Sequence, residues 1–150
     1  MTQSMIPPDQ FAALVAQASD DDLRKGMEEN REELLSEIFR RMPDSFDAAR
    51  ASDVSAVIHW EITGAPNGEV DRWQLTMHEG RCTCVRDGED EPDVVYRVDP
   101  VDFVKLITGV EHGPRMFVFG KLRIRGNLLL AARVQGFFTL PDAKAAEPAG

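Results

Sequence analysis

The most distinctive polar pattern in the sequence is a row of alternating basic residues, Lys121, Arg123 and Arg125. Leu122 and Ile124 lie between them, so a strand would place the basic side chains on one face and the apolar ones on the other. Such a row could bind an anionic headgroup or the phosphates of coenzyme A, because guanidinium groups form strong charge-assisted hydrogen bonds with phosphate. It could also be the solvated face of an edge strand, kept soluble by its charge, and we favour this simpler interpretation.

The cysteines and histidines form no recognisable reactive pattern. Cys82 and Cys84 lie in a predicted strand with their Cα atoms about 6.6 Å apart, which is near the upper limit for a disulfide and badly angled for one. We interpret them as small core residues. His59 and His78 fall on the polar faces of predicted strands and His112 in a loop, so we expect all three at the surface rather than acting as general bases.

Sequence motifs for catalysis and cofactor binding are absent as well. We find no nucleophile elbow, Walker loop, dinucleotide fingerprint or paired-histidine zinc motif. A metal site at the two cysteines would need two further ligands, and no C-x-x-C or paired-His spacing supplies them. The sequence therefore predicts no catalytic residues, no metal and no cofactor.

Composition limits the possible functions further. A chain of 150 residues with 43% hydrophobic residues and a net charge of −9 is expected to fold as one domain with a real core. The acidic balance excludes a nucleic-acid partner, which needs a basic footprint, and it opposes strong adhesion to anionic bilayers. The sequence contains no apolar run of some 18 residues, no secretory signal and no Ser-Lys-Leu ending, so we expect a cytoplasmic protein.

Helical periodicity dominates the N-terminal third of the chain. An amphipathic helix is predicted to begin at Pro8, because proline suits the first helical position. A second helix is predicted from Ser19, which can act as its N-cap, to the residue before Pro43. The three aspartates that follow Ser19 favour the positive end of that helix.

The period changes to two residues after Val54, which indicates strands. Four strands are predicted, at residues 54–63, 72–78, 81–86 and 94–98. The short connections between them predict an antiparallel meander. Glu61 would then lie opposite a partner such as Arg72, as a surface ion pair.

The remaining elements complete an α+β architecture. Asp99 and Pro100 are predicted to open a helix that ends at Gly109, and a fifth strand at residues 121–125 precedes a helix capped by Asn127. We expect a five-stranded, mostly antiparallel sheet covered by helices on one face. The single domain would have a core of about residues 20–140 and a flexible tail at residues 141–150.

The last helix is more apolar than one contact face requires. At about 100° per residue its apolar stripe consists of Leu130, Ala131, Val134, Phe137 and Phe138. Leu128, Leu129 and Ala132 lie off that stripe. The excess fits a helix buried on two sides, a subunit interface or the wall of an apolar ligand site, and periodicity alone leaves these alternatives open.

The segment from Gly120 to Phe138, GKLRIRGNLLLAARVQGFF, resembles the signature near the C-terminus of sterol carrier protein 2 domains. That signature has a glycine, a basic alternating strand, a glycine with Asn or Asp, an Ala/Leu-rich helix and an aromatic end. The matching residues are Gly120, Lys121, Leu122, Ile124, Gly126, Asn127, Ala131 and Phe138. The order of the upstream elements also fits, so the resemblance spans roughly residues 20–140 and implies a stand-alone bacterial member of the family.

The resemblance implies a non-enzymatic lipid carrier, in which an apolar tunnel between sheet and helices holds a sterol, a fatty acid or an acyl chain such as that of acyl-CoA. We expect at most transient membrane contact and consider a homodimer possible. The bulky phenylalanines of this chain put sterol in doubt more than an acyl chain. The residues expected to line the tunnel are Trp73, Leu75, Met77, Phe103, Leu106, Ile107, Met116, Phe117, Phe119, Leu128, Leu129, Ala132 and Phe137.

Two alternatives come from other classes of protein. The fold that the resemblance implies also occurs as an accessory or dimerisation module of larger enzymes, in which the apolar excess would be a protein interface. A small enzyme that uses His59 and Glu61 is the weakest alternative. Co-purified lipid would favour the carrier, and a stable lipid-free dimer would favour the interface.

Overall fold

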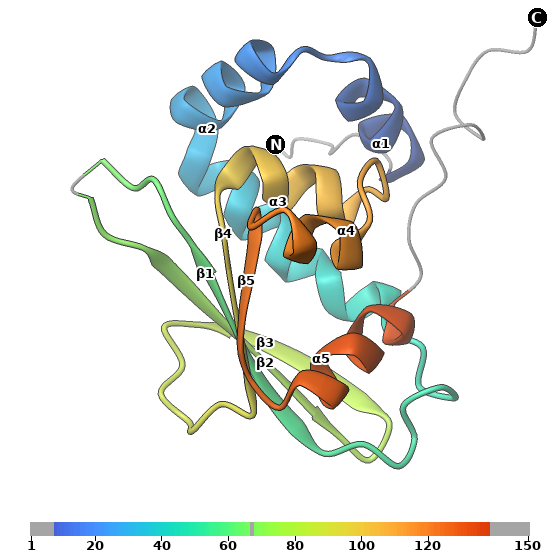
Figure 1. Cartoon of the computed structure of the whole chain (residues 1–150). Coiled ribbons are helices and arrows are strands. Elements are labelled where there is room, and N and C mark those ends of the chain that lie inside the picture. Colours follow the sequence, from blue (N-terminus) through green and yellow to red (C-terminus); the bar gives the residue numbers. More distant parts are fainter. Residues whose placement is uncertain (1–7, 67, 139–150) are drawn as a thin grey trace, which may run out of the picture.

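The computed structural model describes residues 8–66 and 68–138, which form a five-stranded sheet with helices on one side of it (Figure 1). The strands are β1 (Ala56–Ile62), β2 (Asp71–His78), β3 (Arg81–Arg86), β4 (Val94–Val98) and β5 (Leu122–Gly126). The helices are α1 (Pro8–Gln17), α2 (Asp20–Arg41), α3 (Pro100–Ile107), α4 (Gly113–Val118) and α5 (Leu128–Val134), with short 3-10 helices η1 (Met42–Ser45) and η2 (Gln135–Phe137). The predicted α+β architecture is confirmed, while the predicted tail at residues 141–150 lies outside the described residues.

The strand order β3-β2-β1-β4-β5 corrects the predicted meander. β4 does not pair with β3 but lies parallel to β1, with Ile58 opposite Val94 and Ile62 opposite Val98. The other neighbouring strands are antiparallel. The connection at residues 87–93 is therefore not a hairpin turn, because it crosses the sheet from one edge strand to the far side of β1 (Figure 1).

Side-chain hydrogen bonds hold this crossing loop against the outer face of the sheet, which is the face away from the helices. Gln74 Nε2 donates to Asp90 Oδ2 at 3.0 Å, and Asp90 N donates to Gln74 Oε1 at 3.0 Å. His59 Nε2 hydrogen bonds to the same Gln74 Oε1 at 3.0 Å, and only 6% of His59 is exposed. The prediction of a surface position for His59 was wrong, because the acidic loop covers the polar face of β1 and β2.

Helix caps lie where the sequence predicts them. Ser19 Oγ accepts from Asp22 N at 3.1 Å at the start of α2, and an Asp99 carboxylate oxygen accepts from Asp102 N at 2.8 Å at the start of α3. Asn127 Oδ1 accepts from Leu130 N at 3.0 Å. Each side chain satisfies a backbone N–H that has no partner inside its helix, so the starts of these three helices follow from local sequence.

The core fills the layer between the inner face of the sheet and the helices. β1 and β2 contribute the alternating residues Ile58, Trp60 and Ile62 and Trp73, Leu75 and Met77 to it, all of them buried. Helix α5 is fixed to this layer by a buried hydrogen bond from Tyr96 Oη in β4 to the Ala131 carbonyl at 2.7 Å. That bond and the packing of Ala131 and Val134 determine which side of α5 faces inward.

Cys82 and Cys84 pack partly buried against this core from β3, as their interpretation as small core residues predicts. Burial raises the pKa of the Cys82 thiol to about 12, with a smaller contribution from Cys84, and raises that of Cys84 to about 11. Because a raised pKa keeps a thiol protonated and unreactive at neutral pH, both cysteines are poor nucleophiles.

The two sides of α5 should differ in their contribution to stability. Leu130 packs half-buried against the core, whereas 82% of Leu129 is exposed. We expect Leu130→Ala to lower the free energy of unfolding by about 2 kcal/mol and Leu129→Ala to change it by less than about 0.5 kcal/mol, both measured by urea unfolding. Equal losses would contradict this orientation of α5.

The cysteine environment predicts slow alkylation. At pH 7.5 the native protein should react with iodoacetamide about a hundredfold more slowly than the urea-unfolded chain, because burial raises the pKa of the Cys84 thiol to about 11 and that of Cys82 to about 12. Mass spectrometry of timed samples measures both rates. Native cysteines that react as fast as the unfolded ones would show that β3 does not bury them.

Candidate ligand-binding site

The residues predicted to line a tunnel separate into an inner and an outer set. The inner set lies in the layer between sheet and helices and consists of Trp73, Leu75, Met77, Phe103, Leu106, Met116 and Phe137, with Ile107 half-buried beside them. The outer set is exposed and consists of Phe117, Phe119, Leu128, Leu129 and Ala132. The structure therefore brings the first set together around the core and leaves the second set on the surface.

The centre of the inner layer is a cluster of aromatic rings. Phe39 of α2 stacks on Trp73 of β2 at a centroid distance of 4.9 Å and on Phe103 of α3 at 5.1 Å. Trp60 of β1 stacks on Tyr96 of β4 at 4.6 Å and meets Phe103 edge-on at 5.3 Å. We call these residues the aromatic cluster; it joins the three central strands to α2 and α3.

Sequence reasoning included Trp73 and Phe103 but missed the other members of the cluster as site residues. Trp60 and Trp73 are directly opposite each other in the β1–β2 pairing. The alternation of each strand placed both tryptophans on its apolar face, which was a usable signal. Phe39 and Tyr96 join the cluster through contacts between distant segments, for which periodicity gives no signal.

Both tryptophans keep an unused hydrogen-bond donor inside this apolar layer. Trp60 is 6% exposed and Trp73 is 8% exposed, and neither Nε1 has a hydrogen-bond partner among the described residues. A buried N–H without an acceptor costs about 1–3 kcal/mol, and native proteins contain few such groups. The aromatic cluster therefore contains two buried donors that lack an acceptor among the described residues.

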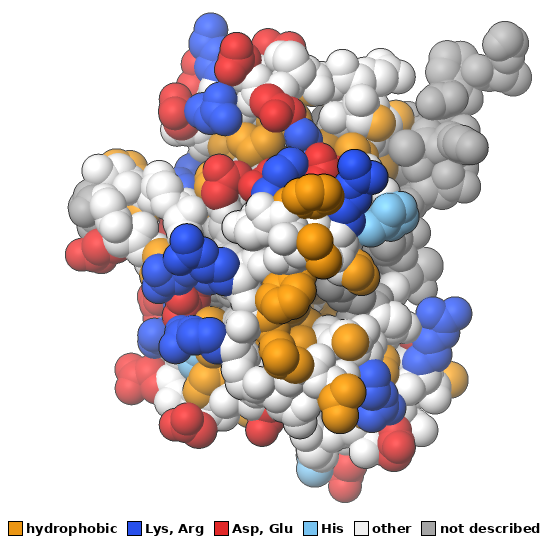
Figure 2. Space-filling model, in the orientation of Figure 1, with side chains coloured by type: hydrophobic (Ala, Val, Ile, Leu, Met, Phe, Trp, Pro, Cys, Tyr) orange, Lys and Arg blue, Asp and Glu red, His pale blue; other side chains and the backbone are white. Residues whose placement is uncertain are grey.

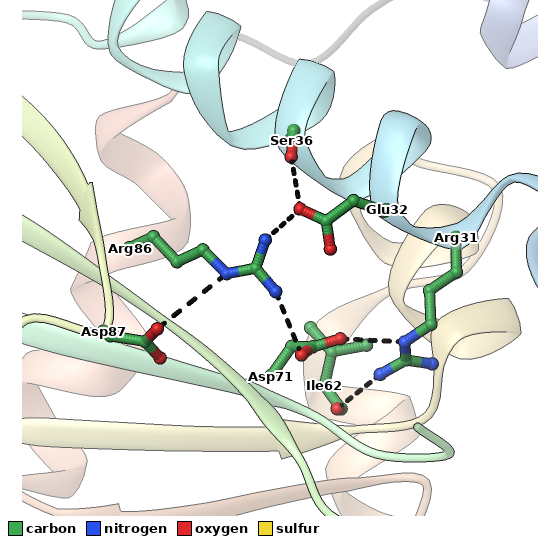
Figure 3. A network of polar contacts seen from close by, with 7 residues as sticks. All are labelled: Arg31, Glu32, Ser36, Ile62, Asp71, Arg86 and Asp87. Atoms are coloured by element: carbon green, nitrogen blue, oxygen red, sulfur yellow. Dashed lines mark hydrogen bonds and ion pairs between the residues drawn. The ribbon is translucent and has the colours of Figure 1, made fainter. Parts of the chain in front are cut away.

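A charged network borders the aromatic cluster where α2 crosses the ends of β1, β2 and β3 (Figure 3). Arg31 Nε donates to Asp71 Oδ2 at 2.8 Å, and Arg31 Nη2 donates to the Ile62 carbonyl at 2.8 Å. Arg86 pairs with Asp71 at 3.2 Å and also with Glu32. Its guanidinium lies 5.1 Å from the centroid of the Trp73 ring.

The two guanidinium groups of this network are paired with carboxylates of the protein and are not available to bind an anionic ligand. The hydrogen bond to Glu32 raises the pKa of Arg86, which the nearby carboxylates of Asp71 and Asp87 also favour. Arg31 is largely shielded, with 11% of its side chain exposed. Since both guanidinium groups already have carboxylate partners, the main role of the network is to fix α2 over the sheet.

The basic row on β5 is also partly neutralised. Arg125 lies 3.7 Å from Glu61 and Lys121 lies 3.6 Å from Glu111. Glu61 is opposite Arg72 in the strand pairing, as predicted, but it forms ion pairs with Arg97, at 2.9 Å, and with Arg125. Because β5 is an edge strand, these contacts support the interpretation of the row as a charged edge.

The outer set forms a band of apolar side chains on the surface. Figure 2 shows hydrophobic side chains gathered over α4 and α5, with Lys and Arg side chains on both sides of them. Exposed fractions are 44% for Phe117, 66% for Phe119, 55% for Leu128 and 82% for Leu129, and Val118 between the phenylalanines is 76% exposed. The sequence prediction had assigned the outer set to the same tunnel lining as the inner set, but the structure separates the two.

Within residues 8–66 and 68–138 no group of three or more His, Cys, Asp or Glu side chains could hold a metal ion. No helix in those ranges is long and apolar enough to span a membrane.

Known proteins share both the sequence pattern and the fold. The model of the SCP-2 sterol transfer family matches residues 35–139, well over half of the chain. Hydroxysteroid dehydrogenase-like protein 2 from Mus musculus is 32% identical over 112 residues, which make up 73% of this chain and 22% of that protein. The oleate-induced peroxisomal protein POX18 from Candida maltosa is 28% identical over 117 residues, or 77% of this chain and 91% of that protein.

A solved structure extends the comparison to three dimensions. The solution structure of palmitated SCP2L2 from Aedes aegypti matches with a TM-score of 0.54 at 20% identity, over 69% of this chain and 90% of that chain. The match demonstrates a common fold. The chain spans about a quarter of the length of the hydroxysteroid dehydrogenase-like relatives, so the similarity to them concerns one part of those proteins. On the extent of the family match, the chain belongs to the SCP-2 sterol transfer family.

Proposed function

We propose that this protein binds a fatty acid or another single acyl chain in its inner layer and carries it without changing it chemically. The observation that carries this proposal is the pair of buried indole N–H groups in an otherwise apolar aromatic cluster. An acyl chain gains free energy by leaving water. Its carboxylate would accept the two hydrogen bonds that the protein leaves unmade.

The proposed lining combines the aromatic cluster with the inner set of predicted residues. Trp60 and Trp73 would contact the head of the ligand, and Leu75, Met77 and Met116 would contact its chain. The rings of Phe39 and Phe103 stack closely in the described structure, so binding would move them apart. Membership of the SCP-2 family and the palmitated relative from Aedes aegypti support this choice of ligand.

The positions of His59 and Glu61 support a carrier over a small enzyme. His59 is on the outer face of β1, hydrogen bonded to Gln74 beneath the crossing loop, while Trp60 beside it faces the inner layer. Glu61 pairs with Arg97 and Arg125. Both groups are on the outer face of β1, so neither His59 nor Glu61 would act on a ligand held in the aromatic cluster.

The second candidate function is a non-catalytic accessory or dimerisation module, which the exposed apolar band favours. Native mass spectrometry of the purified protein separates the two: a carrier retains lipid mass, and a module of the second kind forms a stable dimer without it. A cytoplasmic location stays a prediction of the sequence.

Fatty-acid binding can be followed through the protein's own fluorescence. The chain contains two tryptophans, Trp60 and Trp73, and both lie in the proposed site. We expect cis-parinaric acid to quench tryptophan emission saturably, through energy transfer at short range, and palmitate to reverse the quenching by displacement. If neither fatty acid changes the emission and native mass spectrometry finds no lipid, the carrier function is wrong.

Removal of one indole N–H should weaken binding of the carboxylate selectively. Trp60→Phe and Trp73→Phe keep an aromatic ring but lose the donor, so each should lower the affinity for palmitate about tenfold, the value of one hydrogen bond to a charged group. Hexadecylamine has a similar chain and a cationic head that accepts no hydrogen bond, and it serves as the matched control ligand. Displacement assays should show that each variant narrows the preference for palmitate over the amine; an unchanged preference would rule out the indole groups as head-group ligands.

A further inference from the structure

The apolar band on α4 and α5 is too concentrated to be ordinary surface scatter. Of the eight large hydrophobic residues that are exposed among the described residues, five lie in it: Phe117, Val118 and Phe119 at the end of α4, and Leu128 and Leu129 at the start of α5. We call these five residues the apolar face. Both groups flank strand β5 and lie on the same side of the molecule (Figures 1 and 2). Contiguous exposed patches of this kind mark contact surfaces in monomeric proteins.

The charge of the protein is unevenly distributed along the sequence, and the segment that carries the apolar face is basic. Residues 112–138 contain five basic residues and no acidic one, a net charge of +5. The whole chain has 17 basic and 26 acidic residues, so the remainder carries 12 and 26, a net charge of −14. Two of the five, Lys121 and Arg125, lie near Glu111 and Glu61. The net charge of −9 therefore conceals a basic segment that carries the whole apolar face and has three arginines without an ion pair among the described residues, so the sequence argument against anionic bilayers does not apply to that segment.

Basic side chains border the apolar face in an arrangement suited to a lipid surface. The guanidinium carbon of Arg115 lies 5.6 Å from the centroid of the Phe119 ring. Arg133 follows Leu129 by four residues, about one turn along α5, and its guanidinium carbon lies 5.4 Å from the ring of the buried Phe137. Arg115, Arg123 and Arg133 form no ion pair with any described residue. Long basic side chains beside exposed aromatic and aliphatic groups can place their stems in the interface and their charges at the headgroups.

We propose that the apolar face docks on the surface of a bilayer that contains anionic lipid. The five residues of the apolar face enter the headgroup region, while Arg115 and Arg133 contact anionic headgroups. A second copy of the chain fits less well, because a twofold contact places the same patch on both subunits and would set one basic border against the other. In the docked protein, α5 would lie between the bilayer and the inner layer. The relevance of this position to lipid uptake rests on the proposed function.

Vesicle flotation tests the docking with matched substitutions. Large unilamellar vesicles of phosphatidylcholine with 30 mol% phosphatidylglycerol should bind the protein in 50 mM NaCl, and pure phosphatidylcholine vesicles should bind it at least tenfold less. Val118→Gln should weaken binding about fivefold or more, whereas Val85→Gln on β3, where the valine is 50% exposed, should leave it unchanged.

The contribution of charge is tested separately. Arg133→Gln should weaken binding about fivefold, the value of one basic residue near an anionic surface. Arg81→Gln, on the opposite edge of the sheet, should have no effect.

Each remaining outcome separates the docking from the proposed function. Val118→Gln should leave the displacement of cis-parinaric acid by palmitate unchanged in the absence of vesicles. If the protein binds palmitate but floats equally with both vesicle types, or with neither, docking is wrong and the carrier function stands. If it floats with anionic vesicles but binds no fatty acid, docking stands without the carrier. A dimer in analytical ultracentrifugation that Val118→Gln dissociates, without vesicle binding, would assign the apolar face to self-association instead.

Discussion

Asp93 joins three segments that are far apart in the sequence, and the position of the C-terminal elements depends on it. Its backbone N donates to the Val57 carbonyl at 2.7 Å, and its Oδ2 accepts from Val57 N at 2.8 Å. Its own carbonyl accepts from Asn127 N at 2.9 Å. A side chain on Gly126 would place a Cβ 2.3 Å from that carbonyl oxygen, and Gly126 has a φ of +98°, so the turn from β5 into α5 requires glycine there. One residue thus connects β1, the crossing loop and the start of α5.

The orientation of α5 follows from that connection and gives the helix two different faces. Asn127 caps α5 directly after Gly126, and Tyr96 holds the Ala131 carbonyl from inside. Ala131 and Val134 are therefore buried, while Leu128 and Leu129 face outward. The apolar excess of this helix left three alternatives open: burial on two sides, a subunit interface or the wall of a ligand site. In the structure one side of α5 packs on the core and the other is exposed, so α5 is not buried on two sides. One helix thereby contributes to both surfaces that we propose to contact lipid.

Buried polar side chains occur on both faces of the sheet, in different surroundings. On the outer face, the loop at residues 87–93 buries His59 and Gln74, and Asp90 satisfies the Gln74 amide with hydrogen bonds. On the inner face, the indole N–H groups of Trp60 and Trp73 have no such partner. Arg72 Nε, on the outer face, is a further buried donor without a partner among the described residues. The two indole N–H groups differ from it because they belong to directly opposed residues within an apolar layer. Unsatisfied buried donors are costly, so this pair is the feature of the inner face that a ligand would relieve.

Local sequence determined the elements and their starting points. The caps at Ser19, Asp99 and Asn127, and the alternation that placed Trp60 and Trp73 on apolar strand faces, depend on residues only a few positions apart, so the sequence could predict them. The resemblance to sterol carrier protein 2 domains identified the family from the last strand and helix. Only the tertiary structure decided that β4 lies parallel to β1, that His59 is covered, that Phe39 and Tyr96 complete the aromatic cluster, and that Phe117 and Leu129 stay outside. Each of these depends on contacts between segments dozens of residues apart, and periodicity along a single element carries no information about which distant segment will cover it.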